Sequence, residues 1–199
     1  RAQLQAGAPA HLVIALVTTV VGPLLALTLF LLALGRSPTA WSVLGWQRTR
    51  EGMRFGLTVL LLLLPVVLIT TILSQSLFGH RDEINPIIPE LMATRDPRML
   101  LLLTAATTLA APVIEETLFR GLLFRALHAR LPFWSAALSS GVLFALLHHQ
   151  VAALLPITLL GVILALLARR THSLLASVGA HAGYNGFVTL VVLLTSWAL

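Results

Sequence analysis

The chain has 199 residues, of which 58% are hydrophobic and only 10% are charged, too few charged side chains to cover a soluble globule of this size. It contains no cysteine, which excludes disulfides, thiolate metal sites and a cysteine nucleophile. Its formal net charge of +6 rests on arginines scattered at the ends of apolar runs, so we interpret this charge as setting membrane topology and expect no nucleic-acid partner.

Long apolar runs follow one another along the chain, and each is close to the roughly 20 residues that a helix needs to cross a bilayer. They predict an all-α fold: a polytopic transmembrane helix bundle of about six spans, forming a single membrane domain over 1–199. The proline-rich segment 79–97 is expected to be a loop, either an ordinary one or a lid over the functional site. The predicted spans cover 11–34, 53–78, 98–129, 133–149, 151–168 and 173–198.

The arginines are distributed unevenly between the two sides of the predicted bundle. The positive-inside rule places the richer side, loops 35–52, 125–132 and 168–172, in the cytoplasm. We expect an integral protein of a prokaryotic inner or cell membrane. Eight arginines lie on the richer side (Arg36, Arg48, Arg50, Arg54, Arg125, Arg130, Arg169 and Arg170) and four on the other (Arg1, Arg81, Arg95 and Arg98).

Two adjacent glutamates interrupt the third predicted span, in the stretch APVIEETLFRGLLFRAL (111–127). An acid at the centre of a membrane helix costs roughly 2.5–3.5 kcal/mol on insertion scales, so the pair indicates a function. Glu116 and Arg120 are four residues apart and can form an ion pair, whereas Glu115 points about 100° away and is left for chemistry as a general base. A purely structural ion pair with one protonated acid is the alternative.

Further polar residues lie at membrane depth in the fourth and sixth predicted spans. His148 closes the fourth span, and its neighbour His149 is expected to be interfacial. His181 and Asn185, four residues apart in the sixth span, share one helix face. Together with Glu115 these groups predict a hydrolytic site between helices inside the membrane. Glu115 would deprotonate a water and His148 would share that task or bind a metal, while the pair in the sixth span would bind the metal or donate to an oxyanion.

Three glycines lie on the opposite face of the sixth predicted span: Gly179, Gly183 and Gly186. Small residues at this spacing let two membrane helices approach closely. They predict that this face packs against a neighbouring helix.

In order and spacing, the polar residues resemble the CPBP family of CAAX proteases and bacteriocin-processing enzymes, also called Abi proteins, which includes the eukaryotic Ras-converting prenyl-protein proteases. The resemblance rests on Glu-Glu-x-x-x-Arg at 115–120, Phe-x-x-x-His at 144–148 and His-x-x-x-Asn at 181–185, within about 110–190. It implies an intramembrane endopeptidase that is either glutamate-dependent or a metalloprotease. The site residues that it implies are Glu115, Glu116, Arg120, His148, His181 and Asn185.

The resemblance implies roles for these residues but leaves the cofactor open. Glu115 would activate water with help from His148, and His181 with Asn185 would stabilise the oxyanion. If a metal is bound, Zn²⁺ held by Glu115, His148 and His181 is expected, since two histidines and a carboxylate leave one position open; the alternative is no metal. We expect a protein or peptide substrate, free or lipid-associated, and membrane lipids as partners. The alternative function is a non-catalytic membrane protein of the same fold: a proton-coupled transporter, an immunity protein or a scaffold.

Overall fold

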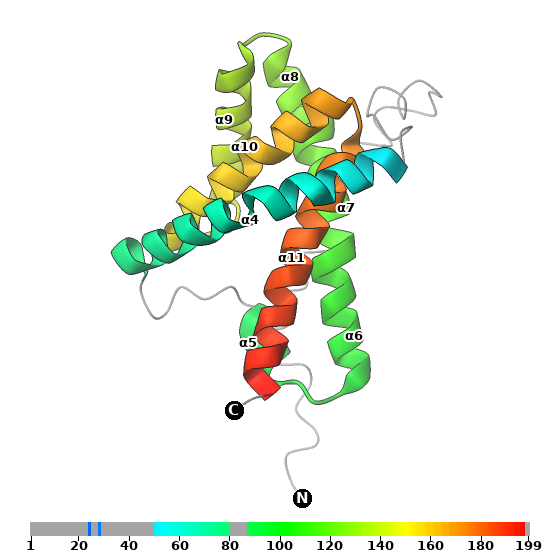
Figure 1. Ribbon diagram of the computed structural model, residues 1–199, viewed down its shortest axis with the longest axis vertical. Helices are drawn as coiled ribbons and strands as arrows, with labels where there is room; N and C mark the ends of the chain where they lie inside the picture. The colour runs from blue at the N-terminus through cyan, green and yellow to red at the C-terminus, as the bar shows by residue number, and fades with distance from the viewer. Residues whose placement is uncertain (1–23, 25–27, 29–49, 80–86, 198–199) are drawn as a thin grey trace, which may run out of the picture.

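The computed structural model describes Leu24, Thr28, residues 50–79 and residues 87–197 (Figure 1). The first predicted span, 11–34, therefore lies outside the described residues apart from Leu24 and Thr28, as does most of the segment 35–52. Where the chain is described, helices joined by short turns make up the structure, which confirms the all-α prediction. The helices are α4 (Arg50–Phe78), α5 (Ile87–Ala93), α6 (Pro97–Ala105), η2 (Ala106–Ala110), α7 (Ala111–Glu116), η3 (Thr117–Leu123), α8 (Phe124–His128), α9 (Phe133–Leu146), η4 (Val151–Ala153), α10 (Leu154–Thr171) and α11 (Leu174–Trp197).

Four helical stretches in the described residues are long and apolar enough to cross a membrane: Glu51–Phe78, Pro97–His128, Val151–Thr171 and Leu174–Ser196. They correspond to the second, third, fifth and sixth predicted spans. Leu61 and Leu62 of α4 are 69% and 72% exposed, as expected for side chains that face lipid rather than water. The chain is therefore an integral membrane protein with a polytopic helical fold.

The fourth predicted span, 133–149, is shorter than expected. Its helix α9 has 14 residues and ends at Leu146, fewer than the roughly 20 that cross a bilayer. The backbone tightens there, because the N–H groups of His148 and His149 donate to the carbonyls of Ala145 (3.0 Å) and Leu146 (3.2 Å), three residues earlier. His149 then adopts a left-handed conformation, with φ 54°. Both histidines thus lie in the turn after α9 and not in the helix.

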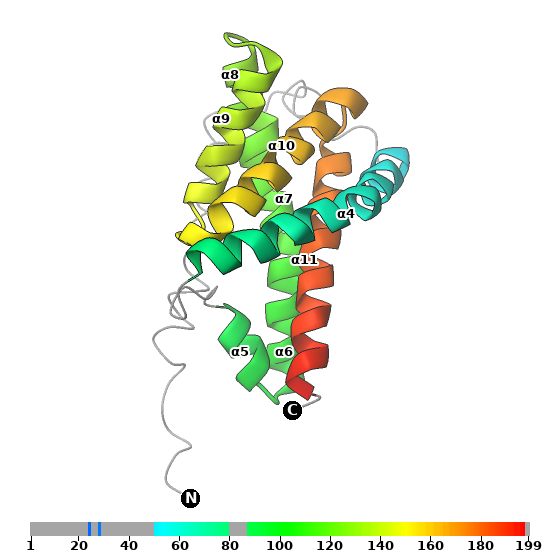
Figure 2. The ribbon, with the colours of Figure 1, turned by 60° about the vertical axis from the view of Figure 1, so that its left-hand side comes forward.

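The long helices pack around a core shared by α4, α10 and α11. Leu60, Leu164 and Ala176 belong to this core and are nearly inaccessible. In both views α6 and α11 run side by side, and α4 crosses α11 (Figures 1 and 2). This core therefore joins α10 and α11, the fifth and sixth predicted spans, to α4, the second predicted span.

The glycine face of α11 makes the close approach to α4 that the sequence predicts. A Cβ atom on Gly179 would lie 2.9 Å from Cγ of Met53, and one on Gly183 would lie 2.8 Å from Cδ2 of Leu57. A Cβ on Gly179 would also lie 3.2 Å from the Met53 carbonyl oxygen, so Gly179 permits the crossing, whereas one on Gly183 would meet only leucine side-chain ends that can move. Gly186 does not contribute, because a Cβ there would meet no atom within 4 Å.

The segment 79–97 contains a helix, α5, where the sequence predicts a loop. Leu91 of α5 is 2% exposed and packs with the buried Leu103 of α6 and with Val192 of α11. Burying this one leucine stabilises a helix too short to show a periodic pattern in the sequence. The remainder of the proposed lid, 80–86, lies outside the described residues.

The third predicted span is one helical stretch whose α-helical geometry is interrupted twice. It begins where expected, because Asp96 accepts a hydrogen bond from the Arg98 N–H (2.9 Å) as N-cap and Pro97 occupies the first helical position. Two π-helical segments, η2 and η3, lie on either side of the six-residue α7, which carries both glutamates. π-helical turns are rare and frequently occur at functional sites.

Candidate active site

The ion pair that the sequence predicts is present and buried. Arg120 donates from Nη1 to Oε1 of Glu116 at 2.7 Å, and both side chains are fully inaccessible. Arg120 also donates from Nη2 to the carbonyl of Gly161 in α10 (3.1 Å), and its guanidinium carbon lies 4.5 Å from the ring centroid of Phe144 in α9. One arginine therefore links the third span to both α9 and α10.

The approach of α9 to α10 is what allows this link. A Cβ on Gly161 would lie 2.7 Å from Cα of Gly141 and 3.2 Å from Nη2 of Arg120. Only glycine leaves the Gly161 carbonyl within reach of the guanidinium at this crossing. Neither glycine was assigned a role from the sequence, although two glycines in facing membrane helices are a signal of close packing.

His181 lies between the two adjacent acids. Its Nδ1 is 3.0 Å from Oε1 of Glu116, and its Nε2 is 3.7 Å from Oε2 of Glu115. An ionised carboxylate can only accept a hydrogen bond, so Nδ1 donates to Glu116 and Nε2 faces Glu115. Glu115 is predicted to lack an ion-pair partner in its own helix, and the partner that it has, His181, comes from α11. It is also the more open acid, with 17% of its side chain exposed against 0% for Glu116.

His148 joins this cluster through an aromatic ring. Its Nδ1 lies 2.9 Å from the Phe144 carbonyl oxygen and therefore donates to it, which leaves Nε2 as the nitrogen with the lone pair. The ring of Phe144 makes edge contacts with His148 (5.0 Å between centroids) and with His181 (5.5 Å). Phe144 thus contacts both histidines, a role that the spacing of the motif did not reveal.

Asn185 makes a contact that the sequence did not predict. Its Nδ2 donates to the carbonyl of Thr107 at 2.9 Å. In η2 the N–H of Ala111 donates to Ala106, five residues earlier, so Thr107 loses its α-helical donor. Its donor in the π-helical register would be Pro112, which has no N–H. Asn185 supplies the missing hydrogen bond with one amide hydrogen and keeps a second for another acceptor.

Glu115, His148 and His181, the residues expected to bind a metal, do not lie close enough together to coordinate one ion. Among the residues that the structure describes, no three His, Cys, Asp or Glu side chains are placed to hold a metal ion. Of the expected ligands, Glu115 and His181 approach each other, with 3.7 Å between Oε2 and Nε2, but His148 does not complete a set of three with them in the described part of the chain. This arrangement does not fit the three-ligand site.

Residues 97–187 match the family model described as type II CAAX prenyl endopeptidase Rce1-like. A comparison with curated proteins and a comparison with solved structures gave no match. The matched region runs from the start of α6 into α11 past Asn185, so it contains all three motifs. The family is one of proteases that act in membranes, in agreement with the four apolar helices. The match supports, for residues 97–187, the resemblance to the CPBP family of CAAX-type intramembrane proteases that the three motifs indicate.

Proposed function

We propose that this chain is an intramembrane endopeptidase that hydrolyses peptide bonds of a membrane-associated protein or peptide with a water molecule activated by Glu115. The observation that carries this proposal is the difference between the two adjacent acids. Glu116 is fully inaccessible and paired with Arg120, whereas Glu115 is partly open and faces His181. An accessible carboxylate inside an otherwise buried polar cluster is suited to accept a proton from water.

In this reaction Oε2 of Glu115 takes a proton from the water molecule, and the hydroxide oxygen attacks the carbonyl carbon of the scissile bond. The carboxyl group then gives the proton to the departing nitrogen as the C–N bond breaks, so a carboxylic acid and an amine leave. His148 assists from Nε2, which carries the lone pair because Nδ1 donates to Phe144. Glu115 returns to its ionised form and the cycle closes.

His181 and Asn185 are the donors that we assign to the oxyanion. Because Nδ1 of His181 donates to Glu116, the ring can donate from Nε2 only when it carries a second proton. In that state the carboxylates of Glu115 and Glu116 are balanced by Arg120 and His181. A neutral cluster avoids the cost of an uncompensated charge inside the membrane, which supports this assignment.

Two arginine-containing segments of the catalytic region face the same side of the membrane in this proposal. We infer that the catalytic region, about 110–190, belongs to a single membrane domain, and that the turn after α8 and the end of α10 face the cytoplasm. Both segments are rich in arginine, and the start of α9 and the end of α10 line one pocket, which supports their lying on the same side.

A cleavage assay in liposomes tests the function. Purified protein is incubated with a library of membrane-anchored peptides, prenylated and unprenylated, and new termini are found by mass spectrometry. Glu115→Gln is expected to lower cleavage at least about a hundredfold, the usual contribution of a general base. Glu51→Gln, which removes an exposed carboxylate from α4, is the matched control and should cleave like wild type.

Two results would contradict the proposal. Equal cleavage by Glu115→Gln and wild type would rule out Glu115 as the base. An absence of any cleaved product, together with proton flux or partner binding that depends on Glu115, would favour the non-catalytic alternative.

A further inference from the structure

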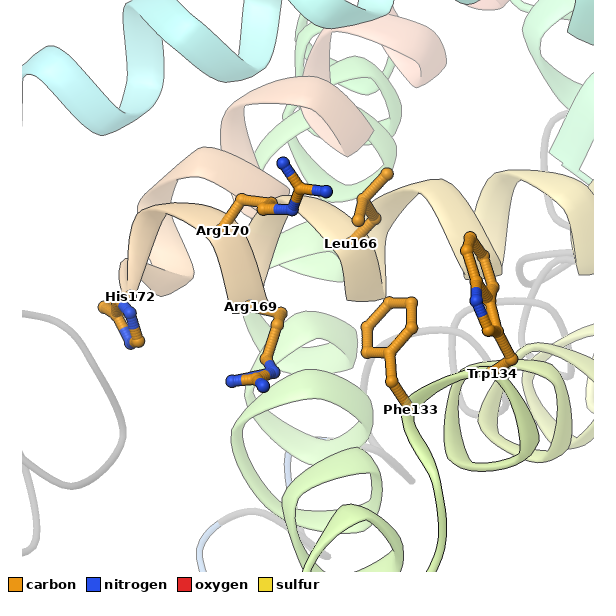
Figure 3. A pocket seen from close by; sticks show the side chains of 6 residues that line it. All are labelled: Phe133, Trp134, Leu166, Arg169, Arg170 and His172. Atoms are coloured by element: carbon orange, nitrogen blue, oxygen red, sulfur yellow. The ribbon is translucent and has the colours of Figure 1, made fainter.

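A second site lies at the opposite end of α9 from His148. The first turn of α9 and the last turns of α10 line an open pocket of about 390 Å³ (Figure 3). The 14 residues of α9 put about 20 Å between this pocket and the turn that carries His148, so the pocket is separate from the candidate active site. The residues that line it are Phe133, Trp134, Leu166, Arg169, Arg170 and His172.

The lining combines cationic and apolar side chains. Arg169 and Arg170 are exposed at the end of α10, and His172 follows in a left-handed conformation (φ 51°) that ends the helix. None of the six lining residues is acidic, so the pocket carries net positive charge. The two guanidinium groups point to different sides of α10 (Figure 3), so together they supply positive charge for an anion rather than a single clamp.

The position of the pocket along the spans indicates where its ligand would be. α10 belongs to the apolar stretch Val151–Thr171, so its last turn lies at the end of the hydrocarbon-crossing segment, at the level of lipid headgroups. Trp134 is 66% exposed beside the half-buried Phe133. Tryptophan at the end of a membrane helix is typical of the lipid–water boundary, where one face is apolar and the other wet.

We propose that this pocket binds the phosphate headgroup of an anionic phospholipid. Arg169 and Arg170 would attract the phosphate by their charge, while Phe133, Trp134 and Leu166 would contact the glycerol and the first carbons of the acyl chains. Basic pockets between membrane helices on the arginine-rich side are suited to such headgroups. A soluble phosphate has the same charge but makes no use of the apolar wall, which favours the lipid.

Lipid counting on the purified protein tests this site. The protein in neutral detergent is titrated with phosphatidylglycerol, phosphatidylcholine or inorganic phosphate, and bound molecules are counted by native mass spectrometry. Wild type is expected to bind phosphatidylglycerol at least about tenfold more tightly than phosphatidylcholine. Arg169→Gln combined with Arg170→Gln should weaken that binding about twenty-five-fold, since each arginine near an anionic surface contributes roughly fivefold.

Three further variants make the result specific. Arg95→Gln with Arg98→Gln removes the same charge from the other side of the protein and should bind the lipid like wild type. Arg169→Lys with Arg170→Lys keeps the charge and should retain most of the binding, which separates charge from folding. Trp134→Ala should weaken lipid binding without changing the binding of inorganic phosphate, and this comparison remains informative if the glutamine variant does not fold.

Three outcomes would overturn the proposal. Equal affinity for phosphatidylglycerol and phosphatidylcholine would show that the site does not select its ligand by negative charge. Equal loss of binding in the two glutamine double variants would show that the pocket is not the binding site. Inorganic phosphate that binds as tightly as phosphatidylglycerol would reassign the pocket to a soluble anion.

Discussion

The hydrogen bond from Asn185 to Thr107 can be tested by a double-mutant cycle with Pro112. Interhelical hydrogen bonds in membrane proteins average roughly 0.6 kcal/mol and reach about 1.7, because the unfolded chain in the membrane finds other partners. The Thr107 carbonyl has no helical donor in either register, and leaving such a group unpaired costs roughly 1–3 kcal/mol. We therefore expect Asn185→Ala to lower the free energy of unfolding by about 1.5 kcal/mol, near the upper end of the interhelical range.

Pro112→Ala restores a backbone N–H at residue 112, which can donate to the Thr107 carbonyl in the π-helical register. In that background the Thr107 carbonyl has a helical donor, so Asn185→Ala should cost less than about 0.5 kcal/mol. Reversible unfolding in mixed micelles measures the free energy of unfolding of wild type, the two single variants and the double variant. Thr195→Ala, on the exposed part of α11, is the control. The reasoning is refuted if Asn185→Ala has the same cost with and without Pro112, or no cost at all.

Two further predictions concern the partners of the ion pair. Arg120→Met should lower the free energy of unfolding by about 3–5 kcal/mol, because it leaves Glu116 buried and unpaired, and adding Glu116→Gln should recover most of that loss; a double variant no more stable than the single one would contradict this. Gly161→Ala should lower the free energy of unfolding by about 1–3 kcal/mol, since its Cβ would press on the Gly141 backbone and force the helices apart. Gly186→Ala is the control, because its Cβ would meet no atom within 4 Å, and it should be neutral or stabilising by up to about 1 kcal/mol. Equal effects of the two alanine substitutions would refute the packing argument.

The parts of the site that lie within one helical turn could be predicted from the sequence. Glu116 and Arg120 are four residues apart, and their ion pair is present even though η3 is π-helical. The contact of His181 with Glu116 joins residues 65 positions apart and depends on how α11 packs beside the third span. A periodic pattern reveals contacts within one helix but not between residues so far apart in the chain. The sequence therefore predicted His181 as a site residue without identifying its partner.

The interruptions of regular helix were harder to predict than the helices. Apolar runs gave four long spans, because burial in a bilayer demands length and apolarity over many residues. The end of α9 at Leu146 and the short helix α5 depend on a left-handed residue and one buried leucine, and neither leaves a periodic signal. Pro112 was visible in the sequence, but a missing N–H indicates only that some carbonyl needs another donor, and the structure identifies Asn185 as that donor.

Two adjacent acids in one membrane helix can serve different purposes because His181 contacts both. Glu116 accepts hydrogen bonds on a single oxygen, Oε1, from both Arg120 and His181, and Arg120 is itself fixed by the Gly161 carbonyl. The orientation of the imidazole ring is therefore set by groups from the third span and α10, while its other nitrogen faces Glu115. A change at Gly161 can therefore reach Glu115 through Arg120, Glu116 and His181 in turn. The buried acid would thus position the histidine, and the open acid would be left to exchange a proton with water.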